Sequence, residues 1–135
     1  MNLQHWYVYH STEKMGYDYS SLESSAVYST SNQQKLCFND VIWVIEGDKS
    51  NPKKFMLVDC FINKEQKYPP FPAGYTQFKL KAIGEGSLIK EPVELSKEDE
   101  WFAQLHSKFI TKQKFFTVLP QLIVEGLINV SSVKL

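Results

Sequence analysis

The 135-residue sequence contains no arginine, and all fifteen of its basic residues are lysines. Arginine is the usual planar fork for guanine edges and for two-point contacts with phosphate. Any anion held by this chain must therefore be held by lysine ammonium groups, backbone N–H groups, hydroxyls or amides. Fifteen acidic residues balance the lysines, so the formal net charge is zero. This balance argues against a general nucleic-acid coat, which needs a strong positive field, but it permits a local basic face.

Cysteine and long apolar runs are also scarce. Cys37 and Cys60 stand alone, without a C-x-x-C pair or a nearby histidine at metal-ligand spacing. A disulfide framework or zinc site is therefore not expected. No apolar run approaches membrane length, and the first residues turn polar too soon for a signal peptide. We expect a cytoplasmic protein with reduced thiols, no membrane contact and no metal or other cofactor.

The remaining composition is that of an ordinary globular protein, and we treat residues 1–135 as a single domain. Three segments rich in aromatic and β-branched residues predict strands, at 5–10, 41–46 and 55–62. The segment 41–46 is almost wholly apolar, which predicts a strand covered on both faces. The turn-rich loop that follows it predicts a β-hairpin with 55–62.

The second half of the chain predicts further strands and two helices. FKLKAI (78–83) alternates apolar residues with lysine, which indicates a strand with one buried face. Residues 88–95 are expected to pair back along an edge, whereas YPPFPAGY (68–75) has too many prolines for a central strand. Ser96 is expected to begin a helix and Pro120 a short last one. The fold class predicted is α+β, a small and partly closed β-barrel with flanking helices.

Motifs for catalysis are few, because the sequence has no nucleophile elbow, phosphate-binding glycine loop or H-E-x-x-H. Asp48, Glu65 and Lys67 are similar to the D…E-x-K metal site of many nucleases. There the E-x-K lies within an apolar strand, whereas here it falls after the strand, where a solvated turn is expected. We predict no catalysis, and a metal-dependent nuclease stays an alternative.

The first third of the chain is unusually aromatic. Trp6 and Val8 should share one face of their strand, and Tyr7 and Tyr9 the other. Tyr17 and Tyr19 lie in a polar, glycine-containing loop where packing does not require their rings. Rings beside hydroxyls and amides suit a planar ligand, although packing within the core and loops is the more common explanation of such rings.

The order of the first 65 residues resembles the PUA-like superfamily, in particular its EVE and YTH branches. The matching segments are WYVYHS, SSAVYST, NQQKL, VIWVIEGDKSN and KFMLVDCFI. The VYST run at 27–30 is similar to a V-W-x-S-T-like run of the YTH branch, whose aromatic residue forms part of a cage for a methylated base. Tyrosine replaces tryptophan in this sequence.

The resemblance implies that Tyr28 is a pocket wall, that His10 and Ser11 lie at the pocket's edge, and that Trp43 is a second wall or core. The predicted base-binding pocket consists of Tyr28, Trp43, His10, Ser11, Trp6 and Tyr17. Lysines at its rim would contact phosphates without reading sequence. The candidates are Lys49, Lys53, Lys54, Lys108 and Lys112.

We therefore predict a non-catalytic module that binds DNA or RNA and holds a base, methylated or flipped in some ligands, in an aromatic pocket. The resemblance also implies a free-standing version of a module that elsewhere is fused to or associated with a nuclease. An alternative is a structural or protein-interaction domain, with YPPFPAGY and the segment 123–135 as its partner surface.

Overall fold

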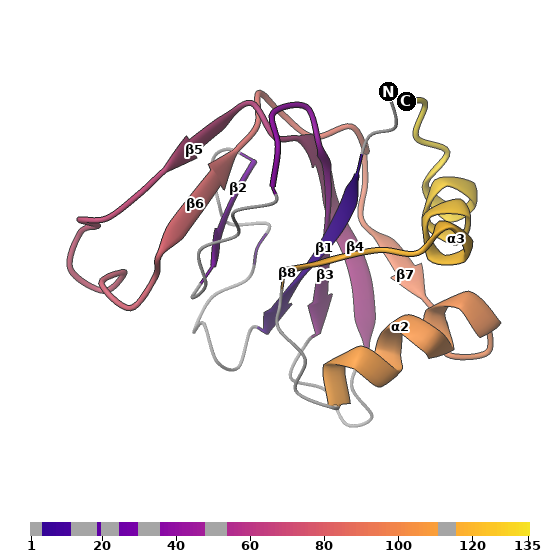
Figure 1. The fold of residues 1–135 in the computed structure, drawn as a ribbon. Coiled ribbons are helices and arrows are strands. Elements are labelled where there is room, and N and C mark those ends of the chain that lie inside the picture. Colours follow the sequence, from indigo (N-terminus) through magenta and orange to yellow (C-terminus); the bar gives the residue numbers. More distant parts are fainter. Residues whose placement is uncertain (1–3, 12–18, 20–24, 30–35, 48–53, 111–115) are drawn as a thin grey trace.

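A computed structural model describes residues 4–11, 19, 25–29, 36–47, 54–110 and 116–135. In chain order the elements are β1 (His5–Ser11), β2 (Ala26–Ser29), β3 (Val41–Gly47), β4 (Phe55–Ile62), β5 (Glu65–Lys67), β6 (Leu80–Ile83), β7 (Val93–Leu95), α2 (Glu100–Ile110), β8 (Phe116–Val118) and α3 (Gln121–Ser131). They build a five-stranded sheet of order β7-β4-β3-β1-β8 and a three-stranded sheet of order β2-β6-β5. Figure 1 shows the larger sheet between the two helices on one side and the smaller sheet on the other.

Strand β3 is the centre of the structure. It pairs in parallel with β1 and antiparallel with β4, and each of its seven residues is buried. Because side chains alternate along a strand, Trp43 points toward the helices while Ile42 and Val44 point toward the smaller sheet. The expectation of a strand covered on both faces is confirmed.

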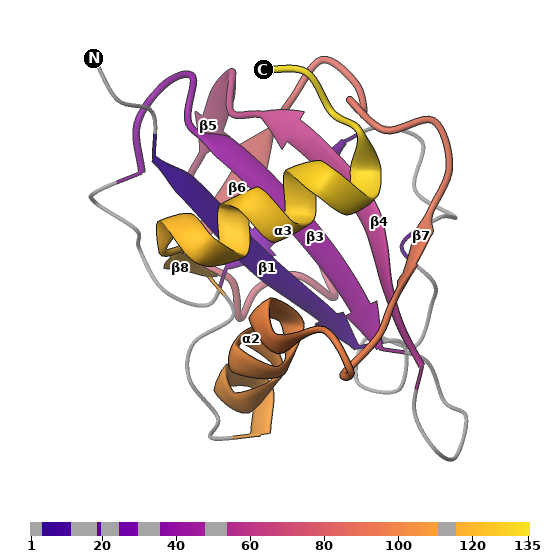
Figure 2. The same ribbon diagram turned by 90° about the vertical axis from the view of Figure 1, so that its right-hand side faces the viewer.

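The apolar side chains form two cores, one on each face of the larger sheet. The helix-side core joins Tyr7, Trp43 and Leu57 to Phe102, Leu105 and Leu127 of the helices, and Figure 2 shows α3 crossing in front of β1 and β3. The sheet-side core joins Trp6, Val8, Ile42 and Val44 to Val27, Leu80 and Ala82 of the smaller sheet. The predicted division of the β1 side chains between two faces is confirmed.

The other expected elements are found with three differences. The hairpin of β3 with β4 and the edge pairing of β7 are present. The first helix begins at Glu100 rather than Ser96, because residues from Ser96 form a turn in which the Ser96 hydroxyl accepts the Glu98 N–H at 3.1 Å. Residues Glu65–Lys67, expected in a turn, form strand β5 because they pair with β6.

The third difference concerns the barrel. The α+β class is confirmed, but the strands of the described residues form two separate sheets that face each other, and they do not close into a barrel. Within the same part of the chain, neither helix has the length and apolar character needed to cross a membrane.

Gly126 shows how closely the two helices pack. A Cβ atom at this position would overlap the indole ring of Trp101 in α2. A glycine inside a helix costs about 1 kcal/mol relative to alanine, so its presence in α3 reflects the space that Trp101 needs.

We predict that Gly126→Ala lowers the free energy of unfolding by up to about 2 kcal/mol. The Cβ would overlap several atoms of the Trp101 ring, so the overpacking cost should lie toward the upper part of the usual range of about 1–3 kcal/mol, above the gain in helix propensity of about 1 kcal/mol. Urea denaturation measures this change. In a Trp101→Ala background the same substitution should instead stabilise the protein, and a destabilisation of equal size there would contradict the packing explanation.

Candidate functional site

The two tryptophans of the predicted pocket lie in different cores and do not share a site. The Trp43 side chain is fully buried against the helices, and its indole N–H donates to Nδ1 of His5 at 3.0 Å. Trp6 lies in the sheet-side core, where its indole N–H donates to Oδ2 of Asp40 at 3.0 Å. Both rings are therefore core with satisfied N–H groups, and a single pocket containing Trp6 and Trp43 is not formed.

Tyr28 occupies the outer face of the smaller sheet. Its neighbour Val27 points into the sheet-side core, so Tyr28, half-buried, points away from it. The Tyr28 ring stacks on Tyr75 with centroids 4.7 Å apart, and it contacts Phe78 at 5.0 Å and Phe71 at 5.5 Å. The proline-rich loop thus supplies partners for Tyr28, and the result is an aromatic platform on an open sheet face.

The other predicted residues lie elsewhere. His10 is buried at the end of β1, and Ser11 pairs with Gly47 at the end of the β1–β3 ladder. Lys54 is exposed just before β4, and Lys108 lies in α2. Four predicted positions fall outside the described residues: Tyr17, Lys49, Lys53 and Lys112.

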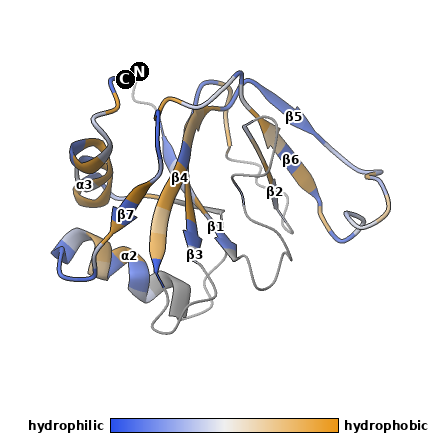
Figure 3. Cartoon of the chain, turned by 180° about the vertical axis from the view of Figure 1, so that it is seen from behind, coloured by the Kyte–Doolittle hydropathy of each residue, from blue (hydrophilic) through white to orange (hydrophobic). Residues whose placement is uncertain are grey.

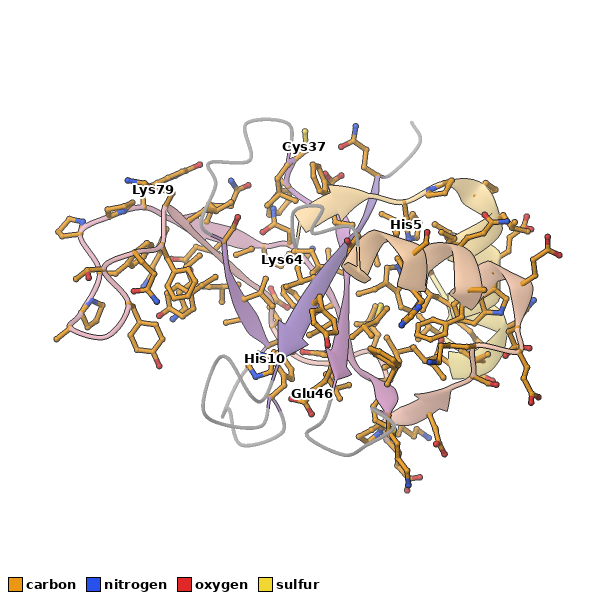
Figure 4. All side chains as sticks on the ribbon, turned by 90° about the horizontal axis from the view of Figure 1, so that it is seen from below. His5, His10, Cys37, Glu46, Lys64 and Lys79 are labelled. Atoms are coloured by element: carbon orange, nitrogen blue, oxygen red, sulfur yellow. The ribbon has the colours of Figure 1, made fainter. Side chains whose placement is uncertain are left out.

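Lysines that the sequence analysis did not assign to phosphate contacts lie beside the aromatic platform. The strand register aligns Tyr28 of β2 with Lys81 of β6 and Lys67 of β5, so these three residues form a row across the outer face. The Lys81 ammonium lies 5.2 Å from the centre of the Tyr28 ring, within the range of a cation–π interaction. Lys79, directly before β6, is exposed, and Figure 4 shows it at the smaller sheet.

This face carries a local positive charge although the whole chain is neutral. Residues 64–81 contain four lysines and a single acidic residue, Glu65. Glu65 lies 3.9 Å from Lys67 in an exposed pair, whereas Lys79 and Lys81 form no ion pair with any described residue. Figure 3 shows β5 as hydrophilic, in contrast to the apolar strands of the larger sheet. The alternation of FKLKAI was the signal for these lysines, but their alignment with Tyr28 follows only from the pairing of β2 with β6.

A second group of polar side chains is buried where the parallel strands end, and Figure 4 shows His10 and Glu46 side by side there. Nε2 of His10 lies 3.7 Å from Oε2 of Glu46, which also accepts the backbone N–H of Tyr19. The expectation that packing does not require the Tyr19 ring is wrong, because Tyr19 is buried in the sheet-side core and its hydroxyl donates to Oδ2 of Asp59 at 2.6 Å. The other Asp59 oxygen, Oδ1, is buried and has no partner among the described residues.

A β-bulge positions Asp59 in this buried polar cluster. Val44 pairs with Asp59 and Ile45 with Leu57, so β4 carries one extra residue, Val58. As a result Asp59 points toward the same face as Val58 and meets Tyr19. Burial, followed by the negative charge of Asp59, raises the pKa of the Tyr19 hydroxyl. The same two causes raise the pKa of the buried Cys60 thiol.

Of the three residues of the nuclease alternative, Glu65 and Lys67 are described, and both lie on β5. Gly47, which precedes Asp48 in sequence, pairs with Phe55 at one end of the β3–β4 hairpin. Glu65 follows the other end, where Val41 pairs with Ile62. Asp48 itself lies outside the described residues. Within the described part of the chain, no group of three or more His, Cys, Asp or Glu residues is placed to hold a metal ion.

Comparison with known proteins gives no relative from which to transfer a function, because no protein-family model matches the chain and no curated protein matches it significantly. The candidate site therefore depends on the geometry of this chain alone.

We predict that the buried Tyr19–Asp59 pair makes stability fall at alkaline pH. An unfolded tyrosine ionises near pH 10, and the raised pKa in the fold means that its contribution is present below that pH and is lost as the pH rises above it. In a Cys60→Ala background, which removes the thiol with a similarly raised pKa, the free energy of unfolding should fall by up to about 1.4 kcal/mol per pH unit above pH 10.

Replacing Tyr19 by Phe should flatten this dependence and lower stability at neutral pH by about 1–3 kcal/mol, because Asp59 loses its described donor. Chemical denaturation between about pH 8 and pH 11 measures both effects. Parallel stability curves for the two proteins would show that Tyr19 is not the titrating group.

Proposed function

We propose that this protein is a nucleic-acid-binding module without catalytic activity, and that it binds through the outer face of the smaller sheet. In this proposal Tyr28 and Tyr75 stack on bases, while Lys67, Lys79 and Lys81 contact phosphates. The observation that carries it is the row of Tyr28, Lys81 and Lys67 in register across three strands.

The chemistry of this face suits a strand with accessible bases. Stacking of a base on an aromatic side chain contributes about 1–3 kcal/mol and tolerates any base, because every base has a π-face. Lysine ammonium groups supply salt-dependent affinity without reading sequence. An arginine-free chain is well suited to binding of this kind, since it lacks the usual side chain for reading guanine edges.

The resemblance of residues 1–65 to PUA-like domains supports the same proposal, because those domains hold nucleobases. We propose accordingly that the two facing sheets are an opened form of that barrel. The base-binding surface we propose nevertheless differs from a closed cage, since Tyr28 has ring partners from a loop and lies on an open face. A methylated base then gains added dispersion on the platform, and strong selectivity for it is not expected.

The protein-interaction alternative is less well supported. Much of the apolar surface in 123–135 is used inside the chain, since Ile123, Val124, Leu127 and Val133 are buried in the helix-side core. In the proline-rich loop, Phe71 and Tyr75 contact Tyr28 and belong to the aromatic platform itself.

We predict that short labelled oligonucleotides of DNA or RNA bind in a fluorescence anisotropy titration at low salt. Each phosphate contact on a single strand contributes about −0.7 to the slope of log K against log salt, so three lysines predict a slope of about −2. Lys81→Gln should reduce the magnitude of this slope by about 0.7. Lys97→Gln, an exposed lysine before α2 on the other side of the larger sheet, is the matched control and should leave it unchanged.

Tyr28→Ala should weaken binding at least about fivefold, the equivalent of roughly 1 kcal/mol of stacking. The panel includes oligonucleotides with N6-methyladenine or 5-methylcytosine, which measures any preference for a modified base. Absence of binding to every oligonucleotide at low salt would overturn the proposed function.

A further inference from the structure

A second aromatic–lysine pair lies near the start of β5. Phe38 is 64% exposed, the highest exposure among the large apolar side chains described. The Lys64 ammonium lies 5.1 Å from the centre of its ring, which repeats the 5.2 Å arrangement of Lys81 over Tyr28. Two such pairs in a neutral chain suggest one ligand with both flat rings and negative charge.

The turn that carries Phe38 is held firmly by the fold. Oδ2 of Asp40, a buried residue, accepts the backbone N–H of Cys37 at 2.8 Å as well as the Trp6 indole N–H. The backbone of Asn63 exchanges hydrogen bonds with Asn39 and Asp40, each 2.8 Å long. Asn39 takes a left-handed conformation with φ 74°, which asparagine adopts more readily than most residues. The exposed ring is therefore displayed on an ordered turn.

Lys64 ties this turn to the smaller sheet. Its ammonium donates to Oδ1 of Asn39 at 2.8 Å, and its backbone N–H donates to the carbonyl of Ile83 at the end of β6. Lys67, at the other end of β5, pairs with Lys81 in the row that includes Tyr28. Along β5 the Phe38–Lys64 pair therefore lies before the first residue, and the row of Lys67, Lys81 and Tyr28 begins on the order of 10 Å further on. Tyr28 itself lies two strands away from β5, on β2.

The row that contains Tyr28 ends at β5, which lies at one edge of its sheet. Among the described strands, β5 pairs with β6 on one side and with none on the other. Since side chains alternate along a strand, Lys67 points to the outer face, whereas Gln66 pairs with the buried Ala82 and points inward. Tyr68 follows on the Gln66 side, 53% exposed, with its hydroxyl accepting a hydrogen bond from Gln66 at 3.1 Å.

From this arrangement, and resting on the proposed function, we infer that the ligand is single-stranded nucleic acid, which crosses the free edge of β5 and stacks one base near Tyr28 and another on Phe38. Lys64 and Lys81 lie at the two contact points, where each can meet a phosphate, and the one acidic residue between them on β5, Glu65, is paired with Lys67 at 3.9 Å. A duplex cannot stack its bases on both Tyr28 and Phe38, because those bases are paired and stacked inside the double helix.

The test compares single strands of about 12 nucleotides, a length within the range bound by single-strand-binding folds, with duplexes of the same length. The single strand should bind at least about tenfold more tightly than the duplex. Phe38→Ala should weaken single-strand binding at least about fivefold, as expected for the loss of one stacked base. Leu122→Ala removes a side chain 50% exposed on α3, on the opposite side of the larger sheet, and should have no effect.

Cys37 offers an independent readout in the unmodified protein, because it is exposed beside Phe38 while Cys60 is buried. Bound single strand should slow the alkylation of Cys37 by iodoacetamide, and Tyr28→Ala should reduce this protection in step with the lost affinity.

The inference and the proposed function fail in different ways. If binding depends on Tyr28 and Lys81 but is unaffected by Phe38→Ala, and Cys37 alkylation is unchanged, the path across β5 is wrong. The proposed function would still hold in that case. Equal affinity for duplex and single strand would overturn the single-strand inference alone. No binding of any oligonucleotide would overturn both.

Discussion

The burial of β3 on both faces is the constraint on which the rest of this structure depends. A strand with Trp43 on one side and Ile42 and Val44 on the other needs an apolar layer over each face. The chain supplies these layers from different parts of the sequence, since the helices follow β7 while the smaller sheet uses β2, β5 and β6.

The parallel pairing of β1 with β3 explains why the segment between them contributes a strand to the smaller sheet. A parallel pair cannot be joined by a tight turn and needs a crossover connection. The crossover in this protein contains β2, which pairs with β6 over the sheet-side core. One consequence is that Tyr28, next to the buried Val27, points to the far side of the smaller sheet and meets the proline-rich loop. The proposed binding surface is therefore a product of the same topology that covers β3.

The ends of the central strands differ in character. At the start of β3, Asp40 and Asn63 organise the turn that displays Phe38, through hydrogen bonds to neighbouring backbone groups. At the other end, His10, Glu46, Tyr19 and Asp59 form a buried polar cluster in which a β-bulge positions one carboxylate. Buried polar groups of this kind require partners because water is excluded. The first arrangement leaves a ring exposed to solvent, whereas the second is closed within the protein.

The sequence by itself determined the α+β class, the hairpin of β3 and β4, the edge position of β7 and the division of Trp6 and Tyr7 between two faces. Each of these follows from local periodicity or turn composition, which the neighbouring residues specify. The sequence also pointed to Tyr28 as a residue to examine, but it grouped Tyr28 with Trp6 and Trp43, which the tertiary structure assigns to two separate cores. Only the tertiary structure decided which lysines lie beside Tyr28, because the register between β2 and β6 joins residues about fifty positions apart. It alone also placed Asp59 beside Tyr19 and Phe38 beside Lys64, since a bulge and a long-range turn leave no periodic signal in the chain.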